Sequence, residues 1–144
     1  MRALLTVHPS VGHLHPLVPV ARALAGAGHE VAVASAAAFR GDVEAFGLRH
    51  IGAGLDWSMS DPSTWGAFPP MPPPGPDFPQ WVVTTLADIA AERMVPDLLE
   101  TAREWAPDLI VREGMEHGGC IAAERLRIPQ PPWPATPTPR STPP

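Results

Sequence analysis

Cysteine, lysine, tyrosine and asparagine are rare or absent in this sequence. Among its 144 residues Cys120 is the one cysteine, and lysine, tyrosine and asparagine do not occur. One cysteine excludes an internal disulfide and a cysteine-based zinc site. No apolar run approaches the roughly 18 residues that a membrane span needs, and the N-terminus lacks the charged and apolar segments of a secretory signal. We therefore expect a cytoplasmic protein with no membrane span.

Positive charge is also sparse. All ten cationic residues are arginines, they form no run, and the formal net charge is −5. Proteins that bind nucleic acids concentrate positive charge on the surface that meets the phosphates. The sequence therefore argues against a nucleic-acid partner. Its length fits one domain of ordinary size with a real core.

Glycine is missing where a cofactor-binding loop would need it. Gly12 is the one glycine between residues 7 and 17. A dinucleotide fingerprint requires three glycines at fixed spacing, and a phosphate loop ends in Gly-Lys-Ser/Thr. Neither pattern is present, so we expect no nicotinamide or ATP site and no cofactor. Ser10 also lacks the preceding glycine of a nucleophile elbow, although Gly12 follows it at the required spacing.

The first 52 residues alternate between strand and helix patterns. Residues 2–7, 30–35 and 48–52 read as strands, while residues 16–28 and 37–46 have helical spacing. Short connections between such elements are typical of a parallel sheet with right-handed crossovers. The predicted fold class is therefore α/β, a Rossmann-like parallel sheet with helices on both faces.

The second half continues this order and then loses it. Residues 81–105 are mostly helical, with Pro96 expected to kink or split the helix. Residues 107–111 read as a fourth strand and residues 118–127 as another helix. Ile128 and Pro129 look like the start of a fifth strand, but the proline-dense residues 130–144 are predicted to be a disordered tail. The expected domain is residues 1–129, incomplete, from a truncated or frame-shifted chain.

His13 is the principal candidate for catalysis. It follows the first strand and is expected just ahead of a helix N-terminus, whose partial positive charge disfavours imidazolium. A neutral histidine suits a general base that takes the proton of a sugar or phenol hydroxyl. The alternative is that His13 only caps the helix or bonds locally.

Two carboxylates follow the fourth strand. Glu113 comes directly after it and Glu116 one turn later. If the fourth strand lies beside the first, both exits open into one crevice, and a carboxylate there would orient the base. Glu113 is the better candidate because it is nearer the strand end, although either carboxylate could be a solvated turn residue. His117 could line the same crevice.

The remaining histidines carry weaker signals. His8 and His15 flank His13, but no carboxylate or cysteine joins them at ligand spacing, so we expect no metal site. His29 and His50 read as surface or turn residues. Cys120 lies in an Ala/Gly-rich helix start and is expected to be a small packing residue.

A long proline-rich loop covers residues 53–80. A loop of this length is either functional or disordered. Linkers are usually poor in aromatic residues, so the large apolar side chains of this loop argue against a simple linker. These side chains are Trp57, Met59, Trp65, Phe68, Met71 and Phe78. A ligand-binding loop and a mobile segment with no fixed role both remain open.

The order of these motifs resembles a known family. The pattern G-H-x-x-P-x-x-x-x-A-x-x-L, followed by A-G-H-E-V, covers residues 12–31, and residues 107–129 are similar to a later segment of the same family. The chain resembles the N-terminal, acceptor-side domain of GT-B fold glycosyltransferases, in particular the bacterial UDP-glycosyltransferase-like and macrolide or antibiotic glycosyltransferases. The resemblance spans most of residues 1–129.

This resemblance implies a function in secondary metabolite biosynthesis. The family transfers a sugar from a nucleotide-diphosphate-sugar to a hydroxyl of a small-molecule acceptor such as a polyketide, macrolide or phenolic aglycone, with inversion and without a metal. His13 matches its catalytic base, and Glu113 stands where an aspartate is usual. The expected substrate-binding residues are Gly12, Trp57, Trp65, Phe68, Phe78, Glu116 and His117. The donor site belongs mainly to a second domain, so it is largely missing here and little turnover is expected from this chain alone.

Two other functions remain open. In the first, the chain is a non-catalytic domain that binds an acceptor or a partner and works with a separately encoded donor domain. A weaker hypothesis is a small hydrolase-like or nucleotide-binding domain that uses Ser10.

Overall fold

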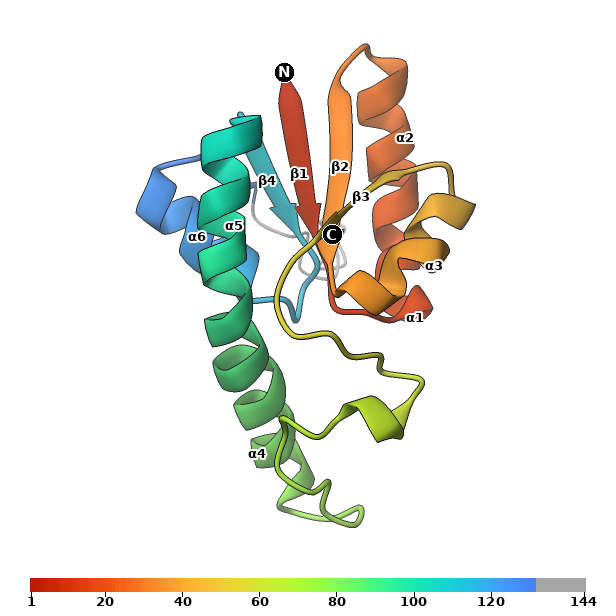
Figure 1. The fold of residues 1–144 in the computed structure, drawn as a ribbon, viewed down its shortest axis with the longest axis vertical. Coiled ribbons are helices and arrows are strands. Elements are labelled where there is room, and N and C mark those ends of the chain that lie inside the picture. Colours follow the sequence, from red (N-terminus) through yellow and green to blue (C-terminus); the bar gives the residue numbers. More distant parts are fainter. Residues whose placement is uncertain (132–144) are drawn as a thin grey trace, which may run out of the picture.

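The chain forms three layers, with a parallel sheet between two layers of helices (Figure 1). This computed structural model describes residues 1–131. The strands are β1 (Arg2–Thr6), β2 (Glu30–Ser35), β3 (Arg49–Gly52) and β4 (Leu109–Arg112). They lie in the order β3-β2-β1-β4, and every neighbouring pair is parallel. The predicted α/β class and the position of the fourth strand beside the first are confirmed.

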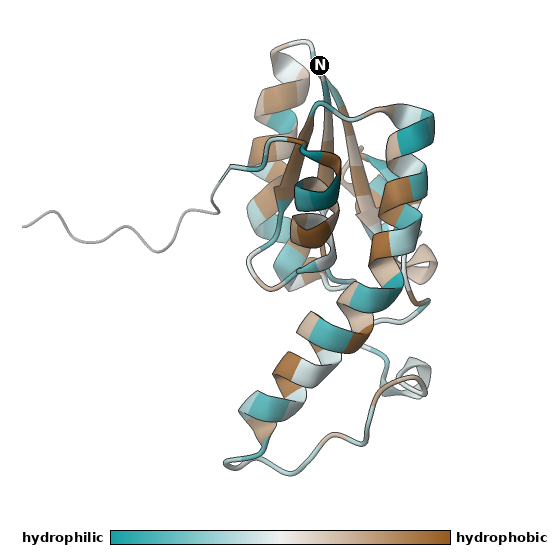
Figure 2. Ribbon diagram, turned by 90° about the vertical axis from the view of Figure 1, so that its left-hand side faces the viewer, coloured by the Kyte–Doolittle hydropathy of each residue, from teal (hydrophilic) through white to brown (hydrophobic). Residues whose placement is uncertain are grey.

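The strands are buried on both faces, and alternate residues serve opposite layers. On β1, Ala3 and Leu5 belong to the core beneath the helices that follow β1 and β2, whereas Leu4 belongs to the core on the other face. All three side chains are completely buried. Figure 2 shows the hydrophobic strands between helices that carry both hydrophobic and hydrophilic residues. This two-sided burial explains why the strands read as continuous apolar runs.

The helices after β1 begin earlier than expected. The segments on this face are α1 (Val11–Leu14), η1 (His15–Leu17), α2 (Val18–Gly26), η2 (Ala37–Phe39) and α3 (Arg40–Ala45). The sequence predicted a helix from residue 16. Proline lacks an N–H, and the helix tightens to 3-10 geometry at His15–Leu17, around Pro16, instead of starting there. Gly28 lies just past α2 with φ 83°, a left-handed conformation that glycine adopts readily at the end of a helix.

A long helical column covers the other face and extends beyond the sheet (Figure 1). It consists of α4 (Phe78–Val82), the π-helix η4 (Val83–Ala90) and α5 (Ala91–Trp105). The sequence placed a kink or split at Pro96, but α5 runs through this exposed proline without a break. The hydrogen-bond pattern changes instead at Val83, well before Pro96.

The last described residues return to the sheet. After α6 (Gly118–Leu126), the amide of Ile110 on β4 donates to the carbonyl of Pro129 at 3.1 Å. This one ladder-like bond lies where a fifth strand was expected, but residues 128–131 have no assigned strand. The predicted disordered tail lies outside the described residues from residue 132 onward. Within residues 1–131, no helix has both the length and the apolar character for crossing a bilayer.

Candidate active site

The carboxyl ends of β1 and β4 bring two distant segments together. The amide of Glu113 donates to the carbonyl of Thr6 at 2.9 Å, which extends the β1–β4 ladder by one residue. The chain leaves β1 toward one helical layer and reaches β4 from the other. This is a topological switch point, where open α/β sheets form a crevice for ligands.

His13 and Glu113 meet at this crevice. His13 Nδ1 lies 2.9 Å from Glu113 Oε2, and the two side chains are 21% and 11% exposed. The second carboxylate oxygen of Glu113 accepts from the amide of Met115 at 3.1 Å. Oε2 has no aligned hydrogen-bond donor within residues 1–131, so the contact with His13 is an ion pair by distance. Catalytic hydrogen bonds often tighten only when substrate binds.

This pairing changes the expected electrostatics of His13. The contact with Glu113 raises the pKa of His13 above its ordinary value of 6.5, and burial opposes this shift without cancelling it. The sequence predicted a ring kept neutral by a helix start. The direction of the shift is the opposite of the one expected, because a carboxylate touches the ring and His13 lies inside the four-residue helix α1 instead of ahead of a helix. Burial disfavours the Glu113 carboxylate, but the interactions with His13, the amide of Met115 and His8 together outweigh it and hold the pKa of Glu113 below 4.5.

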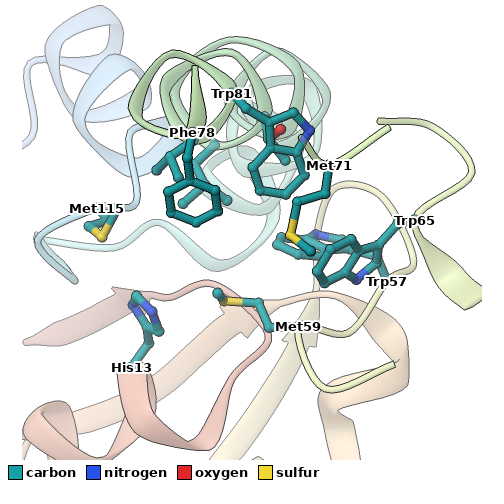
Figure 3. Close-up of a pocket in the computed structure, with 11 residues that line it drawn as sticks. His13, Trp57, Met59, Trp65, Met71, Phe78, Trp81 and Met115 are labelled. Atoms are coloured by element: carbon teal, nitrogen blue, oxygen red, sulfur yellow. The ribbon is translucent and has the colours of Figure 1, made fainter. Parts of the chain in front are cut away.

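A largely apolar cavity of about 190 Å³ adjoins His13. Its lining comes from the turn after β1, the proline-rich loop, the helical column and the turn after β4. The lining residues are His13, Trp57, Met59, Trp65, Met71, Phe78, Trp81, Val82, Thr85, Leu86 and Met115. Figure 3 shows His13 on the side opposite Phe78 and Trp81, with the sulfur-bearing side chains between the two sides.

The proline-rich loop is held in place by its aromatic residues. Trp57 packs edge-on against Phe68 at a ring distance of 4.9 Å. The indole of Trp65 donates to the carbonyl of Ser58 at 2.7 Å, and that of Trp81 donates to the carbonyl of Pro69 at 2.8 Å. The loop is therefore a packed wall of the cavity in this structure, which favours a ligand-binding role over a segment without a fixed role.

Comparison with known proteins shows that the chain is similar to antibiotic glycosyltransferases. No protein-family model matches the chain. It is 38% identical over 130 residues to the L-demethylnoviosyl transferase of Streptomyces niveus, covering 90% of this chain and 33% of the relative. It is 32% identical over 142 residues to the 10-deoxymethynolide desosaminyltransferase of Streptomyces venezuelae, covering 86% of this chain and 33% of the relative.

The fold agrees with these sequence relatives. The glycosyltransferase SsfS6 of Streptomyces sp. SF2575, solved in complex with thymidine diphosphate, superposes with a TM-score of 0.77 at 29% identity. The superposition covers 90% of this chain and 37% of that one. The chain is therefore similar in sequence and fold to part of the GT-B fold glycosyltransferases. It spans about one third of the length of the curated relatives that it matches.

Glu116 does not reach the crevice. Its side chain is completely buried, accepts from the hydroxyl of Thr6, and accepts from the amide of Gly119 at 2.9 Å. Burial raises the pKa of this carboxyl above 4.5, with its hydrogen bonds opposing the shift. The expectation that Glu116 binds substrate is wrong, because the turn after β4 directs it into the core. It ties the start of α6 to β1.

Three of the predicted binding residues line the cavity and three others do not. Trp57, Trp65 and Phe78 are part of the lining. Phe68 is buried behind Trp57 and borders a separate, more open hollow. Gly12 and His117 are outside the cavity lining as well. For these residues proximity along the sequence was misleading, since His117 precedes α6 and Gly12 lies on the exposed side of α1.

Several residues of the cavity lining were missed from the sequence. The helical column supplies Trp81, Val82, Thr85 and Leu86, and the turn after β4 supplies Met115. The apolar residues at helical spacing in residues 82–90 were the one available signal, and they were used only to predict a helix. Met59 and Met71 were noted as apolar loop residues but not as binding residues.

Two other histidines, His8 and His50, are buried. His8 is 4% exposed, its Nε2 lies 2.8 Å from the carbonyl of Met115, and its ring meets His13 edge-on at 6.1 Å. Burial lowers the pKa of His8. His50 was expected at the surface, yet it is 6% exposed on β3. Within residues 1–131 no group of three metal-ligating side chains converges.

Proposed function

We propose that this chain is the acceptor-side part of an inverting glycosyltransferase. In this proposal an acceptor hydroxyl binds beside His13, and the body of the acceptor occupies the apolar cavity. The donor is a nucleotide-diphosphate-sugar, held mainly by protein outside this chain. The acceptor class is a small aglycone such as a polyketide, a macrolide or a phenol. The names of two relatives, which give 10-deoxymethynolide and 3-alpha-mycarosylerythronolide B as the molecules that receive desosamine, support this class.

The contact between His13 Nδ1 and Glu113 Oε2 at 2.9 Å is the observation that carries the proposal. A carboxylate on one ring nitrogen fixes the ring orientation and stabilises the imidazolium that forms during proton transfer. The other nitrogen, Nε2, is then the atom that accepts the proton. It has no hydrogen bond within residues 1–131, and His13 lines the cavity.

The proposed reaction is a single displacement. The acceptor oxygen forms a bond to the anomeric carbon of the sugar while the bond to the nucleotide diphosphate breaks on the opposite face. The hydroxyl proton moves to Nε2 of His13, and the electron pair of the broken bond leaves with the diphosphate. Glu113 balances the positive charge that develops on the ring. The apolar walls exclude water, which would otherwise compete with the acceptor.

The proposed base is tested in a chimera. Residues 1–131 replace the matching segment of the Streptomyces niveus relative, which supplies the remaining two thirds of a glycosyltransferase. His13→Ala is expected to reduce the rate of sugar transfer by about 10²- to 10⁴-fold, with nucleotide-sugar binding nearly unchanged. His15→Ala is the matched control, because His15 is exposed and packs on Phe46 away from the cavity.

Equal turnover in the His13→Ala and His15→Ala chimeras would rule out His13 as the base. A wild-type chimera that binds an aglycone but transfers no sugar would favour the alternative, a non-catalytic acceptor-binding domain. Product formation is measured by chromatography, and aglycone binding is measured separately by quenching of tryptophan fluorescence.

A further inference from the structure

His8 joins the segment after β1 to the turn after β4. Its side chain is buried, and its Nε2 lies 2.8 Å from the carbonyl oxygen of Met115. A carbonyl oxygen can only accept a hydrogen bond, so Nε2 carries the hydrogen and donates it. The proposed reaction gives this histidine no role, although its ring meets that of His13 edge-on at 6.1 Å.

The contacts of Met115 connect His8 to the base through one residue. While the carbonyl of Met115 accepts from His8, its amide donates to Oε1 of Glu113 at 3.1 Å. The other oxygen of this carboxylate, Oε2, lies 2.9 Å from Nδ1 of His13. A shift of Met115 therefore moves the carboxylate that contacts the base.

The turn after β4 depends on side chains for its position. Residues 113–117 lie between β4 and α6 and belong to neither element. They include Gly114, and the backbone of glycine is less restricted than that of other residues. Arg112 supports the turn from β4 itself, since its Nη1 donates to the carbonyl of Gly114 at 3.0 Å. His8 differs because it comes from the segment that carries His13, so its hydrogen bond ties the two halves of the site together.

We propose that His8 is a positioning residue, which holds Met115 so that the carboxylate of Glu113 stays against the base. This inference rests on the proposed function, since it takes His13 as that base. In this proposal His8 contacts neither the sugar nor the acceptor oxygen, and it transfers no proton. Its position matters because a displacement of about 1 Å in an active site can cost about 10²-fold in rate.

His8 carries no charge while His13 titrates, which allows a clean test. Burial lowers the pKa of His8 below 6.5, although its hydrogen bond to Met115 opposes this shift. The contact with Glu113 raises the pKa of His13 above 6.5. The titratable groups that face His8 are Glu113, His13 and His117. A neutral replacement of His8 therefore removes no charge beside His13 in this pH range, and a changed pKa of His13 would report a changed contact with Glu113.

The test is an NMR titration of the His13 ring in the 144-residue chain. His8→Phe keeps a flat ring but loses the donor, and we expect the pKa of His13 to fall toward 6.5. His8→Gln keeps a donor, because its side-chain nitrogen lies as many bonds from Cα as Nε2 of histidine. In this variant the pKa of His13 should stay near its wild-type value.

His50→Phe is the matched control. His50 is also buried, and its Nε2 also lies near a backbone carbonyl, that of Ala36 at 3.1 Å. It belongs to β3, at the opposite edge of the sheet from β4. This variant should leave the pKa of His13 unchanged.

A second measurement uses the wild type and does not depend on whether a variant folds. The chemical shifts of the two ring nitrogens of His8 report which one carries the hydrogen, and we expect Nε2 at neutral pH. A hydrogen on Nδ1 instead would leave no donor for Met115 and would refute the proposal.

Activity is measured in the glycosyltransferase chimera. His8→Phe should lower kcat by about 10-fold with KM for the nucleotide-sugar nearly unchanged, and His8→Gln should restore most of the rate. An unchanged kcat in His8→Phe would refute the positioning role.

The titration has its own contradicting results. An unchanged pKa of His13 in folded His8→Phe would mean that His8 only fills the core. An equal fall in His8→Gln, or in His50→Phe, would mean that the hydrogen bond to Met115 is not the cause. Equal transfer by the wild-type and His13→Ala chimeras would refute the base itself, a result that the titration does not affect.

Discussion

Gly119 is the position where one added methyl group should have the largest effect on stability. A Cβ there would overlap with Thr6 Oγ1 and lie 2.7 Å from Oε2 of Glu116. These are the atoms that join the start of α6 to β1. Because all of them are buried, the structure has no solvent-exposed side chain that can move aside. Gly119→Ala should therefore disrupt a packed contact and a buried hydrogen-bond set together.

The expected destabilisation of Gly119→Ala is about 3 kcal/mol. Overpacking a filled core costs about 1–3 kcal/mol, and a weakened hydrogen bond to the buried Glu116 carboxyl costs a similar amount. The better helix propensity of alanine returns about 0.5–1 kcal/mol. Gly26→Ala is the matched control, because Gly26 also lies in a helix and a Cβ there meets no atom within 4 Å. That variant should be stabilised slightly.

Urea denaturation followed by circular dichroism measures both variants. The midpoint should fall for Gly119→Ala and stay equal or rise for Gly26→Ala, with similar dependence on urea concentration in both. If Gly119→Ala were as stable as the wild type, the close packing of Thr6, Glu116 and Gly119 would be refuted. If both variants lost the same stability, helix propensity or an unfolded-state effect would be the cause.

Two further predictions concern the ion pair and the loop. Glu113→Gln should cost the most stability between about pH 4.5 and 6.5, where His13 and Glu113 are both charged. The stabilisation by the ion pair is lost at higher pH, as His13 loses its proton through its raised pKa. It is lost at lower pH, as Glu113 takes up a proton through its lowered pKa. Thermal unfolding of both proteins across pH 3–9 measures this, and a pH-independent difference would argue against the pairing. Phe68→Ala should destabilise the chain by about 3 kcal/mol, because Phe68 is 8% exposed and packs against Trp57. Phe78 is 39% exposed and lines the cavity, so Phe78→Ala should change stability little and weaken aglycone binding, measured by quenching of tryptophan fluorescence. Equal loss of stability in both phenylalanine variants would contradict the difference in burial.

The positions of the strands along the chain could be predicted, because the sequence patterns that mark a strand are local. The predicted second strand, residues 30–35, agrees with β2 (Glu30–Ser35), since its apolar run stands between a helix-ending glycine and a new helical pattern. Helix boundaries were less accurate. The sequence predicted that the helix starts at Pro16. Instead, the helical segment starts earlier and adopts 3-10 geometry around this proline. The π-helix η4 left no recognisable pattern in the sequence.

The pairing of His13 with Glu113 was predictable for a related reason. Glu113 directly follows β4, and His13 lies in the segment after β1. The sequence analysis expected the two residues to share one crevice if these strands were neighbours. Glu116 was harder, because it and Glu113 are alike in type and lie three residues apart. Only the path of the turn after β4 sends one carboxylate to His13 and the other to Thr6 and Gly119.

The sequence by itself determined the α/β class, the crevice at the ends of the first and fourth strands, and the two side chains that meet there. Strand and helix patterns depend on residues a few positions apart, so they can be read along the chain. Tertiary structure alone decided the composition of the cavity, which joins the loop, η4 and the turn after β4. It also decided the protonation preference of His13, because charge on the ring depends on a carboxylate 100 positions away in the chain that comes within 2.9 Å in space.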